Sequence, residues 1–260
     1  MFVTSASPVT PKKIISLVPS ITELLFDLGL CSETIAITKF CIHPTDWCST
    51  KEKIGGTKNL QIKKIIGLQP DLIIANKEEN NQAQIEALVE LFPVYITDVA
   101  NYEDAIKMIL RVGEITSKYA EAERLVENIE KNFKLIMKPA QDIKTAYFIW
   151  KDPFMTIGGE TFISDMMRRI GLQNIFQNQE RYPTITLEDV ADASPQLILL
   201  SSEPYPFKEN HILQIQSVVQ TAKILLADGE MFSWYGSRMK NMPFYFNNLL
   251  KEIGILHPYE

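Results

Sequence analysis

The sequence has few of the features that mark specialised chemistry or a special environment. Cysteine is scarce, with three in 260 residues. All three, Cys31, Cys41 and Cys48, lie in one short segment, and an odd number does not indicate a disulfide framework. No stretch of about 20 residues is continuously apolar, which excludes a membrane-spanning helix. P-loops, nucleophile elbows, zinc-protease helices and dinucleotide-binding turns are also missing, so no catalytic residue is predicted and we do not expect an enzyme.

Basic residues are outnumbered by acidic ones, 26 against 32, and no cluster of Lys and Arg appears. This argues against nucleic acid as a partner, because phosphate binding needs a basic patch. Residues 1–13 contain no basic region followed by an apolar one, so no secretory leader is visible. Either the protein stays in the cytoplasm or a leader has been removed, and the initial Met1 favours the first alternative.

The composition that is present, 46% hydrophobic and 22% charged residues, is typical of a globular protein. Short apolar runs alternate with segments of helical periodicity, which predicts an α/β fold with parallel sheets. In the first part of the chain the runs at 14–18, 34–38, 69–75 and 93–98 predict strands, and 21–30, 59–68 and 84–91 predict helices. In the last part 145–150, 195–201 and 223–227 predict strands, and 162–172, 187–193, 211–220 and 243–254 predict helices.

One long helix is predicted between these two parts, from Asn101 to Lys138. Asn101 is a good N-cap, Asp104 follows at the position of a capping-box acid, and Pro139 ends the helix. Gly113 is the position at which the helix would kink or divide. We therefore predict an N-terminal lobe over 1–100, a connecting helix over 101–138 and a C-terminal lobe over 139–260.

The two lobes also resemble each other in sequence. Residues 21–30 align with 163–172, which matches Glu23 with Asp165 and Gly29 with Gly171. Residues 62–74 align with 187–199 and match Pro70 with Pro195. We infer an internal duplication, with room in the first lobe for an extra strand and the cysteine-bearing loop. Chance similarity of generic α/β segments is the alternative.

Several motifs in this order resemble a known family. They are SLVPSITELLFDLGL, the GGTKN turn, LQPDLIIA, the long central helix, RYP and SWYGSRM. Together they are similar to the helical-backbone (class III) substrate-binding proteins of ABC importers, and most similar to vitamin B12-binding proteins and to ferric-siderophore and heme receptors.

This resemblance implies two Rossmann-like lobes joined by one long backbone helix, with a ligand cleft between the lobes. It implies a monomer without an intrinsic cofactor that delivers a metal chelate (corrinoid, heme or ferric siderophore) to a permease, in the periplasm or cell envelope. The alternative is a cytoplasmic carrier, sensor or tetrapyrrole-metallation enzyme on the same scaffold.

Ligands of parallel α/β folds meet the loops at the carboxyl ends of strands. After the first strand, Pro19 and Ser20 begin a helix whose N-terminus suits an anionic group, or they simply cap that helix. After the second strand, Phe40, Cys41 and His43 combine an aromatic ring with two potential metal ligands. The alternative for Cys41 is a small buried side chain.

Aromatic rings in the loops suit the flat face of a macrocycle. Tyr182 and Trp234 lie on segments where the resemblance implies aromatic ligand contacts, whereas Thr57 and Asn76 replace aromatic residues expected there. Arg238 suits a carboxylate, phosphate or propionate, or else a surface salt bridge. The full set of predicted ligand-binding residues is Pro19, Ser20, Phe40, Cys41, His43, Thr57, Asn76, Phe154, Tyr182, Trp234, Tyr235 and Arg238.

Three acidic residues follow strands of the two lobes: Glu78, Glu79 and Glu203. The resemblance implies acidic patches that pair with permease arginines, and these glutamates lie in about the right places. Solvated surface acids are the alternative.

Overall fold

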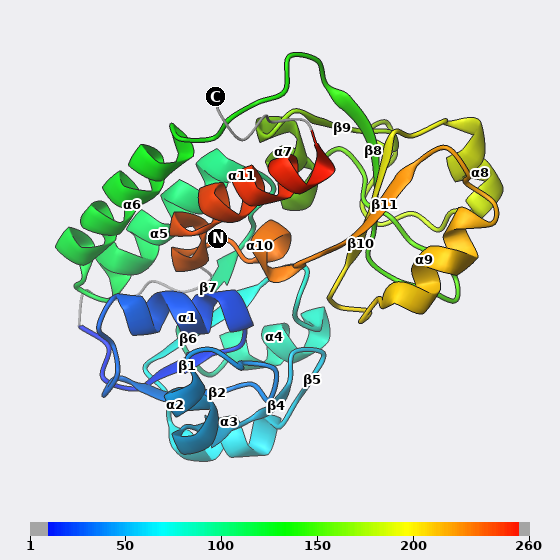
Figure 1. Ribbon diagram of the computed structural model, residues 1–260. Helices are drawn as coiled ribbons and strands as arrows, with labels where there is room; N and C mark the ends of the chain where they lie inside the picture. The colour runs from blue at the N-terminus through cyan, green and yellow to red at the C-terminus, as the bar shows by residue number, and fades with distance from the viewer. Residues whose placement is uncertain (1–9, 255–260) are drawn as a thin grey trace. The chain divides into compact units, whose positions relative to one another are not determined.

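The structure is a computed structural model that describes residues 10–254 (Figure 1). Residues 1–9 and 255–260 lie outside the described residues. The prediction that the N-terminus has no secretory leader therefore falls largely outside them. The chain forms two compact units that exchange short segments. The first unit comprises the residues up to Val99, Glu103–Glu130 and Tyr235–Arg238, and the second comprises Ala100–Tyr102, Lys131–Trp234 and the residues from Met239 onward. The predicted lobe ranges are contiguous and contain no such exchange.

The first unit is built on a five-stranded parallel sheet with the order β3-β2-β1-β6-β7. Its central strands are buried and strongly apolar, as expected for a parallel sheet covered on both faces. The four strands predicted from sequence are confirmed, and β3 is additional. The strands are β1 (Ile14–Ser16), β2 (Thr34–Ile37), β3 (Glu52–Lys53), β6 (Leu72–Asn76) and β7 (Val94–Thr97), and β4 (Gly55–Gly56) pairs with β5 (Asn59–Leu60) in a hairpin.

The helices of the first unit follow the strands. The three helices predicted in this part are confirmed, while α2 falls in a stretch predicted to be a loop. A side-chain cap begins α4, because Asn81 Oδ1 accepts the Gln84 N–H at 3.2 Å. The helices are α1 (Pro19–Asp27), α2 (Thr45–Thr50), α3 (Ile62–Leu68) and α4 (Gln82–Val89), followed by α5 (Tyr102–Ile115) and α6 (Tyr119–Phe133).

The second unit has a four-stranded parallel sheet with the order β11-β10-β8-β9. The predicted strands are confirmed as β8, β10 and β11, whereas β9 was missed. The strands are β8 (Ile143–Phe148), β9 (Leu172–Asn174), β10 (Leu197–Ser201) and β11 (Lys223–Ala227). The helices are α7 (Phe162–Arg169), α8 (Leu187–Asp192), α9 (Glu209–Gln216), α10 (Glu230–Ser233) and α11 (Met242–Ile253), with a 3-10 turn η1 (Ser237–Lys240).

Strand order supports the internal duplication. The series β2-β1-β6-β7 in the first sheet has the same order as β9-β8-β10-β11 in the second. The matched helices α1 and α7 are followed by Gly29 and Gly171, and both glycines have φ of 75°, which strains an L side chain. The extra strand of the first sheet is therefore β3, since β9 is the counterpart of β2.

The helical stretch predicted over 101–138 is divided, as the sequence allowed, but the division does not fall at Gly113 and an unbroken helix is wrong. The structure has two helices, α5 and α6, with a break at residues 116–118 where Ser117 adopts a positive φ of 58°. The two helices pack side by side, because a Cβ added at Gly113 would overlap Ala122 (Figure 1). Gly113 therefore marks a helix contact, and the boundary between the units lies inside α6, after Glu130.

Each exchanged segment is held by an acid on a matched helix. Glu23 in α1 binds Arg238 within the first unit, and Asp165 in α7 accepts the Tyr102 N–H at 2.9 Å within the second. Glu23 and Asp165 are the residues that the sequence repeat aligns. The duplication thus extends to how each unit binds its exchanged segment.

No helix within residues 10–254 is both long enough and apolar enough to cross a membrane.

Candidate functional site

The carboxyl-end loops of the first sheet are tied together by Asn80. Its Nδ2 donates to Leu17 O at 3.2 Å and to Thr57 O at 3.1 Å, and its Oδ1 accepts the Asn76 N–H at 2.8 Å. One buried amide thus joins the loop after β1, the β4–β5 turn and the loop after β6. Thr57 is buried at this junction. Sequence reasoning missed Asn80, although an asparagine in a polar run directly after a strand is a turn signal.

Asn76 shapes the loop after β6. Its Oδ1 accepts the N–H groups of Glu78 and Glu79 at 2.8 and 2.9 Å. Its Nδ2 donates to the carbonyl and the hydroxyl of Thr97 at 3.0 and 3.1 Å. These bonds use both amide hydrogens and both oxygen lone pairs, so a ligand contact through Asn76 would have to replace one of them. The same bonds fix the turn that carries Glu78, which is half-buried, and Glu79, which is exposed.

Phe40 offers an aromatic face after β2. Its side chain is 51% exposed, although the ring rests on Gly56, where an added Cβ would lie 3.0 Å from Phe40 Cε2. The Lys39 ammonium lies 5.0 Å from the ring centroid. An exposed ring supported from below by backbone and flanked by a cation suits a flat, anionic ligand.

Cys41 lies in a closed environment. It is fully buried, Thr22 Oγ1 donates to its Sγ at 3.1 Å, and Thr38 Oγ1 lies 3.2 Å away. Burial raises the pKa of the Cys41 thiol, and the two threonine bonds oppose the rise. His43 is half-buried. Metal ligation by Cys41 and His43 stays a prediction, while the surroundings of Cys41 are those of a structural thiol.

The described part of the chain, residues 10–254, contains no group of three or more His, Cys, Asp and Glu side chains arranged to hold a metal ion.

The first turn of α1 is covered by the exchanged segment of the first unit. The hydroxyl of Tyr235 bonds to the side chains of Thr97 and Ser20, and burial, with the nearby Glu79 charge, raises the pKa of Tyr235. Ser20 is buried and Pro19 is half-buried. The structure brings Ser20 and Tyr235 together as predicted site residues, but they contact each other at the place where an anionic group was expected.

Arg238 forms a two-point ion pair. Its Nε donates to Glu23 Oε2 and its Nη2 to Glu23 Oε1, both at 2.9 Å, and the arginine is 9% exposed. The planar fork that was predicted to bind a ligand carboxylate thus binds a carboxylate of the protein. Glu23 was not predicted as a site residue.

In the second unit, Phe154 and Tyr182 lie on neighbouring segments after β8. Ile185 N–H donates to Phe154 O at 3.0 Å, and Gly158 N–H donates to Arg181 O at 2.7 Å. Both aromatic side chains are half-buried, and the Phe154 ring lies 5.5 Å from that of Phe148 in the core. The segments approach so closely that a Cβ at Gly158 would overlap a carbonyl oxygen. The Gly158–Gly159 pair therefore allows the backbone to approach residues 177–180 closely.

Trp234 ends α10 beside Glu203. The indole Nε1 donates to Glu203 Oε1 at 2.8 Å, and Trp234 is 7% exposed. Glu203 is half-buried, and Ser233 Oγ donates to the same oxygen at 2.8 Å. Permease docking by Glu203 stays a prediction, and its carboxylate already has partners within the second unit.

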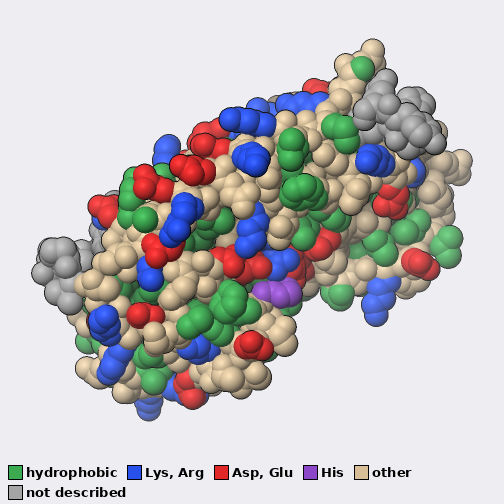
Figure 2. All heavy atoms as spheres, turned by 60° about the vertical axis from the view of Figure 1, so that its left-hand side comes forward, with side chains coloured by type: hydrophobic (Ala, Val, Ile, Leu, Met, Phe, Trp, Pro, Cys, Tyr) green, Lys and Arg blue, Asp and Glu red, His purple; other side chains and the backbone are tan. Residues whose placement is uncertain are grey.

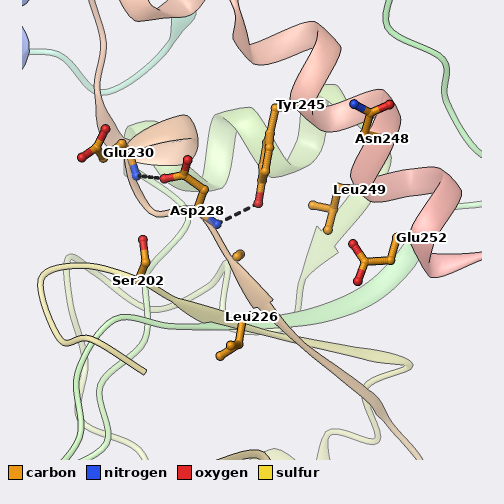
Figure 3. A pocket seen from close by; sticks show the side chains of 9 residues that line it. Ser202, Leu226, Asp228, Glu230, Tyr245, Asn248, Leu249 and Glu252 are labelled. Carbon is orange, nitrogen blue, oxygen red and sulfur yellow. Dashed lines mark hydrogen bonds between the residues drawn. The ribbon is translucent and has the colours of Figure 1, made fainter. Parts of the chain in front are cut away.

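A hollow of about 550 Å³ opens at the carboxyl ends of β10 and β11 in the second unit (Figure 3). Asp228 and Tyr245 meet there, with the Asp228 N–H donating to the Tyr245 hydroxyl at 2.8 Å, and burial raises the pKa of Tyr245 to about 12. Three carboxylates and no Lys or Arg line it, and none of the predicted site residues does. The lining residues are Ser202, Leu226, Ala227, Asp228, Glu230, Tyr245, Asn248, Leu249 and Glu252.

Figure 2 shows Lys and Arg side chains interspersed with Asp and Glu over the face in view. This face has no broad basic patch of the kind that nucleic acid binding requires.

Two parallel α/β units with aromatic side chains in their carboxyl-end loops are typical of solute-binding proteins. The periplasmic binding protein family matches this chain over residues 14–228, and the chain belongs to this family.

Individual proteins of known sequence or structure are similar to this chain. An uncharacterized ABC transporter substrate-binding lipoprotein of Bacillus subtilis is 29% identical over 201 residues, which cover 73% of this chain and 63% of that protein, less than two thirds of its length. A vitamin B12-binding protein of Vibrio parahaemolyticus is 24% identical over 195 residues, covering 73% of this chain and 70% of that protein. The crystal structure of a possible iron-binding, periplasmic solute-binding protein from Staphylococcus epidermidis superimposes with a TM-score of 0.77 at 22% identity, covering 94% of this chain and 99% of that one. This last likeness establishes the fold.

Proposed function

We propose that this protein binds a metal chelate and delivers it to an ABC importer. The observation that carries the proposal is family membership together with the aromatic side chains at the carboxyl-end loops, above all Phe40, which is 51% exposed on a rigid support. Phe154 and Tyr182 are the corresponding contacts in the second unit. Corrinoids and porphyrins have broad flat faces, and aromatic rings cover such faces well.

A corrinoid, a heme and a ferric siderophore are the candidate ligands. The vitamin B12-binding relative supports a corrinoid, whereas Thr57 and Asn76 stand where aromatic residues are expected and favour a smaller or more polar chelate. In each candidate the metal is held by the chelating ligand's own donors, and the protein supplies the binding surface.

Delivery to an importer places the protein in the cell envelope, a location that the lipoprotein relative supports. The permease contact in this proposal is made by Glu78 and Glu79, since Asn76 fixes the turn that carries both. The fixed turn removes the backbone entropy cost of ordering this loop, so an arginine that pairs with either glutamate restricts only side chains.

Fractionation of native cells tests delivery. We expect the protein in the envelope fraction, and we expect uptake of a cobalt or iron chelate at nanomolar supply to require it. Purely cytosolic protein would contradict the importer role and favour a cytoplasmic carrier, sensor or metallation enzyme.

A further inference from the structure

Two side chains donate hydrogen bonds to one oxygen of Glu203. The indole Nε1 of Trp234 and the hydroxyl of Ser233 each lie 2.8 Å from Glu203 Oε1. Trp234 is also the last aromatic residue before the chain passes into the first unit at Tyr235. Glu203 thus binds the indole of the last residue in the Lys131–Trp234 segment of the second unit.

Glu203 is itself held in place from the sheet. Ser201 Oγ at the end of β10 donates to Glu203 O at 2.6 Å, and the Tyr147 hydroxyl lies 3.1 Å from Ser201 Oγ. Tyr147 is fully buried in β8. On the other side, a Cβ added at Gly229 would lie 2.6 Å from Glu203 Cγ, so the start of α10 presses against the glutamate side chain. The carboxylate has little freedom to turn.

We propose that Glu203 is a positioning residue that fixes the orientation of the Trp234 indole for contact with the ligand. The role rests on the proposed function together with the sequence-based prediction that Trp234 contacts the ligand. A permease arginine that reached this carboxylate would compete with the indole and with Ser233. Docking to the permease therefore does not account for these two hydrogen bonds. The chain of contacts runs from the buried Tyr147 through Ser201 and Glu203 to Trp234.

Two conservative variants separate positioning from charge. Glu203→Gln removes the charge but keeps an oxygen acceptor at the same reach. Glu203→Asp keeps the charge but shortens the side chain by one methylene, so its oxygen cannot reach both donors. A positioning role predicts that Gln resembles the parent and Asp does not, and a role in charge alone predicts the reverse. Glu188→Gln, on the exposed surface of α8, is the matched control.

Trp234 itself reports the outcome in ligand-free protein. The chain has three tryptophans, so replacing Trp47 and Trp150 by Phe leaves Trp234 as the only tryptophan, which excitation at the red edge selects over the tyrosines. We expect Glu203→Asp to raise the acrylamide quenching constant about threefold, because the loosened indole becomes accessible, and Glu203→Gln and Glu188→Gln to match the parent. Equal quenching in Asp and parent, or increased quenching in Gln, would overturn the proposal.

Binding supplies a second readout, with cyanocobalamin and hemin as the probes. For whichever probe the parent binds, we expect about tenfold weaker binding in Glu203→Asp and a change below about twofold in Glu203→Gln. Equal affinity in Asp and parent would contradict positioning of a ligand-contacting ring. If the parent bound neither probe, the corrinoid and heme forms of the ligand proposal would be in error, and the quenching comparison would still decide whether Glu203 positions Trp234.

Discussion

The three cysteines differ in how far their side chains are exposed to solvent. Cys31 is exposed and Cys48 is half-buried. Cys41 is buried, its sulfur contacts two threonine hydroxyls, and burial raises its thiol pKa. Since the thiolate is the reactive form, both burial and the raised pKa protect Cys41.

We therefore predict that a disulfide reagent labels Cys31 rapidly, Cys48 more slowly and Cys41 only on unfolding. Absorbance of the released thiol from Ellman's reagent at neutral pH measures this, and Cys41→Ala should remove only the phase that appears in denaturant. Fast labelling that disappears in Cys41→Ala would contradict the closed site and revive Cys41 as an accessible metal ligand.

The sequence identified many of the loop residues but not their partners. Phe40 is exposed on the predicted loop. Asn76 and Arg238, in contrast, donate hydrogen bonds to Thr97 and Glu23, which are distant in sequence. Such pairs form only when the fold brings the two residues together, so no local sequence pattern predicts them.

Short elements and helix breaks are set by tertiary packing in this chain. The two-residue strand β3 and the three-residue strand β9 are too short to show a period. Helical sequence continues through residues 116–118, yet the chain breaks there so that α6 packs against α5 at Gly113. The helices of ordinary length were predicted because each carries its own apolar stripe.

The contact at Gly113 gives a test at the scale of helices. We predict that Gly113→Ala lowers the free energy of unfolding by about 2 kcal/mol, since the added methyl overlaps Ala122. Gly67→Ala in α3 is the matched control: an added Cβ meets no atom within 4 Å, so the better helix propensity should stabilise by about 0.5–1 kcal/mol. Urea unfolding measures both, and equal midpoints for the two variants would contradict the packing of α5 on α6.

The exchanged segment at Tyr102 gives a pH-dependent test. Burial raises the pKa of Asp165, but hydrogen bonds from Arg169, the Tyr102 N–H and Arg168 outweigh burial and lower it overall. A carboxylate with a lowered native pKa stabilises the fold above its unfolded pKa of about 3.9 and loses that contribution as pH falls through the native value.

We predict that Asp165→Asn costs about 2 kcal/mol of unfolding free energy at pH 7. The difference from the parent should persist down to about pH 4 and shrink at lower pH, where Asp165 is protonated in both states. Urea unfolding across this range is the measurement, and Asp192→Asn on the exposed surface of α8 should change little at any pH. A difference that stayed constant into strong acid would show that the carboxylate charge is not what holds Tyr102.

At the scale of the whole molecule, the duplicated arrangement is the feature that the sequence predicted best. Alignment of the two halves anticipated matched helices, and the strand orders of the two sheets agree. The exchange of Ala100–Tyr102 and Tyr235–Arg238 between the units was not anticipated, because such segments are short and irregular. The ligand lies outside what the fold determines, since the family uses one architecture for several solutes.

The central claim, that the chain binds a metal chelate, is tested most directly by absorbance titration of the full chain with cobinamide, hemin and a ferric siderophore. Metal-free protoporphyrin distinguishes recognition of the flat face from recognition of the metal. We predict a Kd below about 1 μM, or roughly 8 kcal/mol of binding free energy, for one of the three chelates. The same titration of Phe40→Ala should give about tenfold weaker binding. Failure of all three chelates to bind more tightly than about 1 mM would contradict the account.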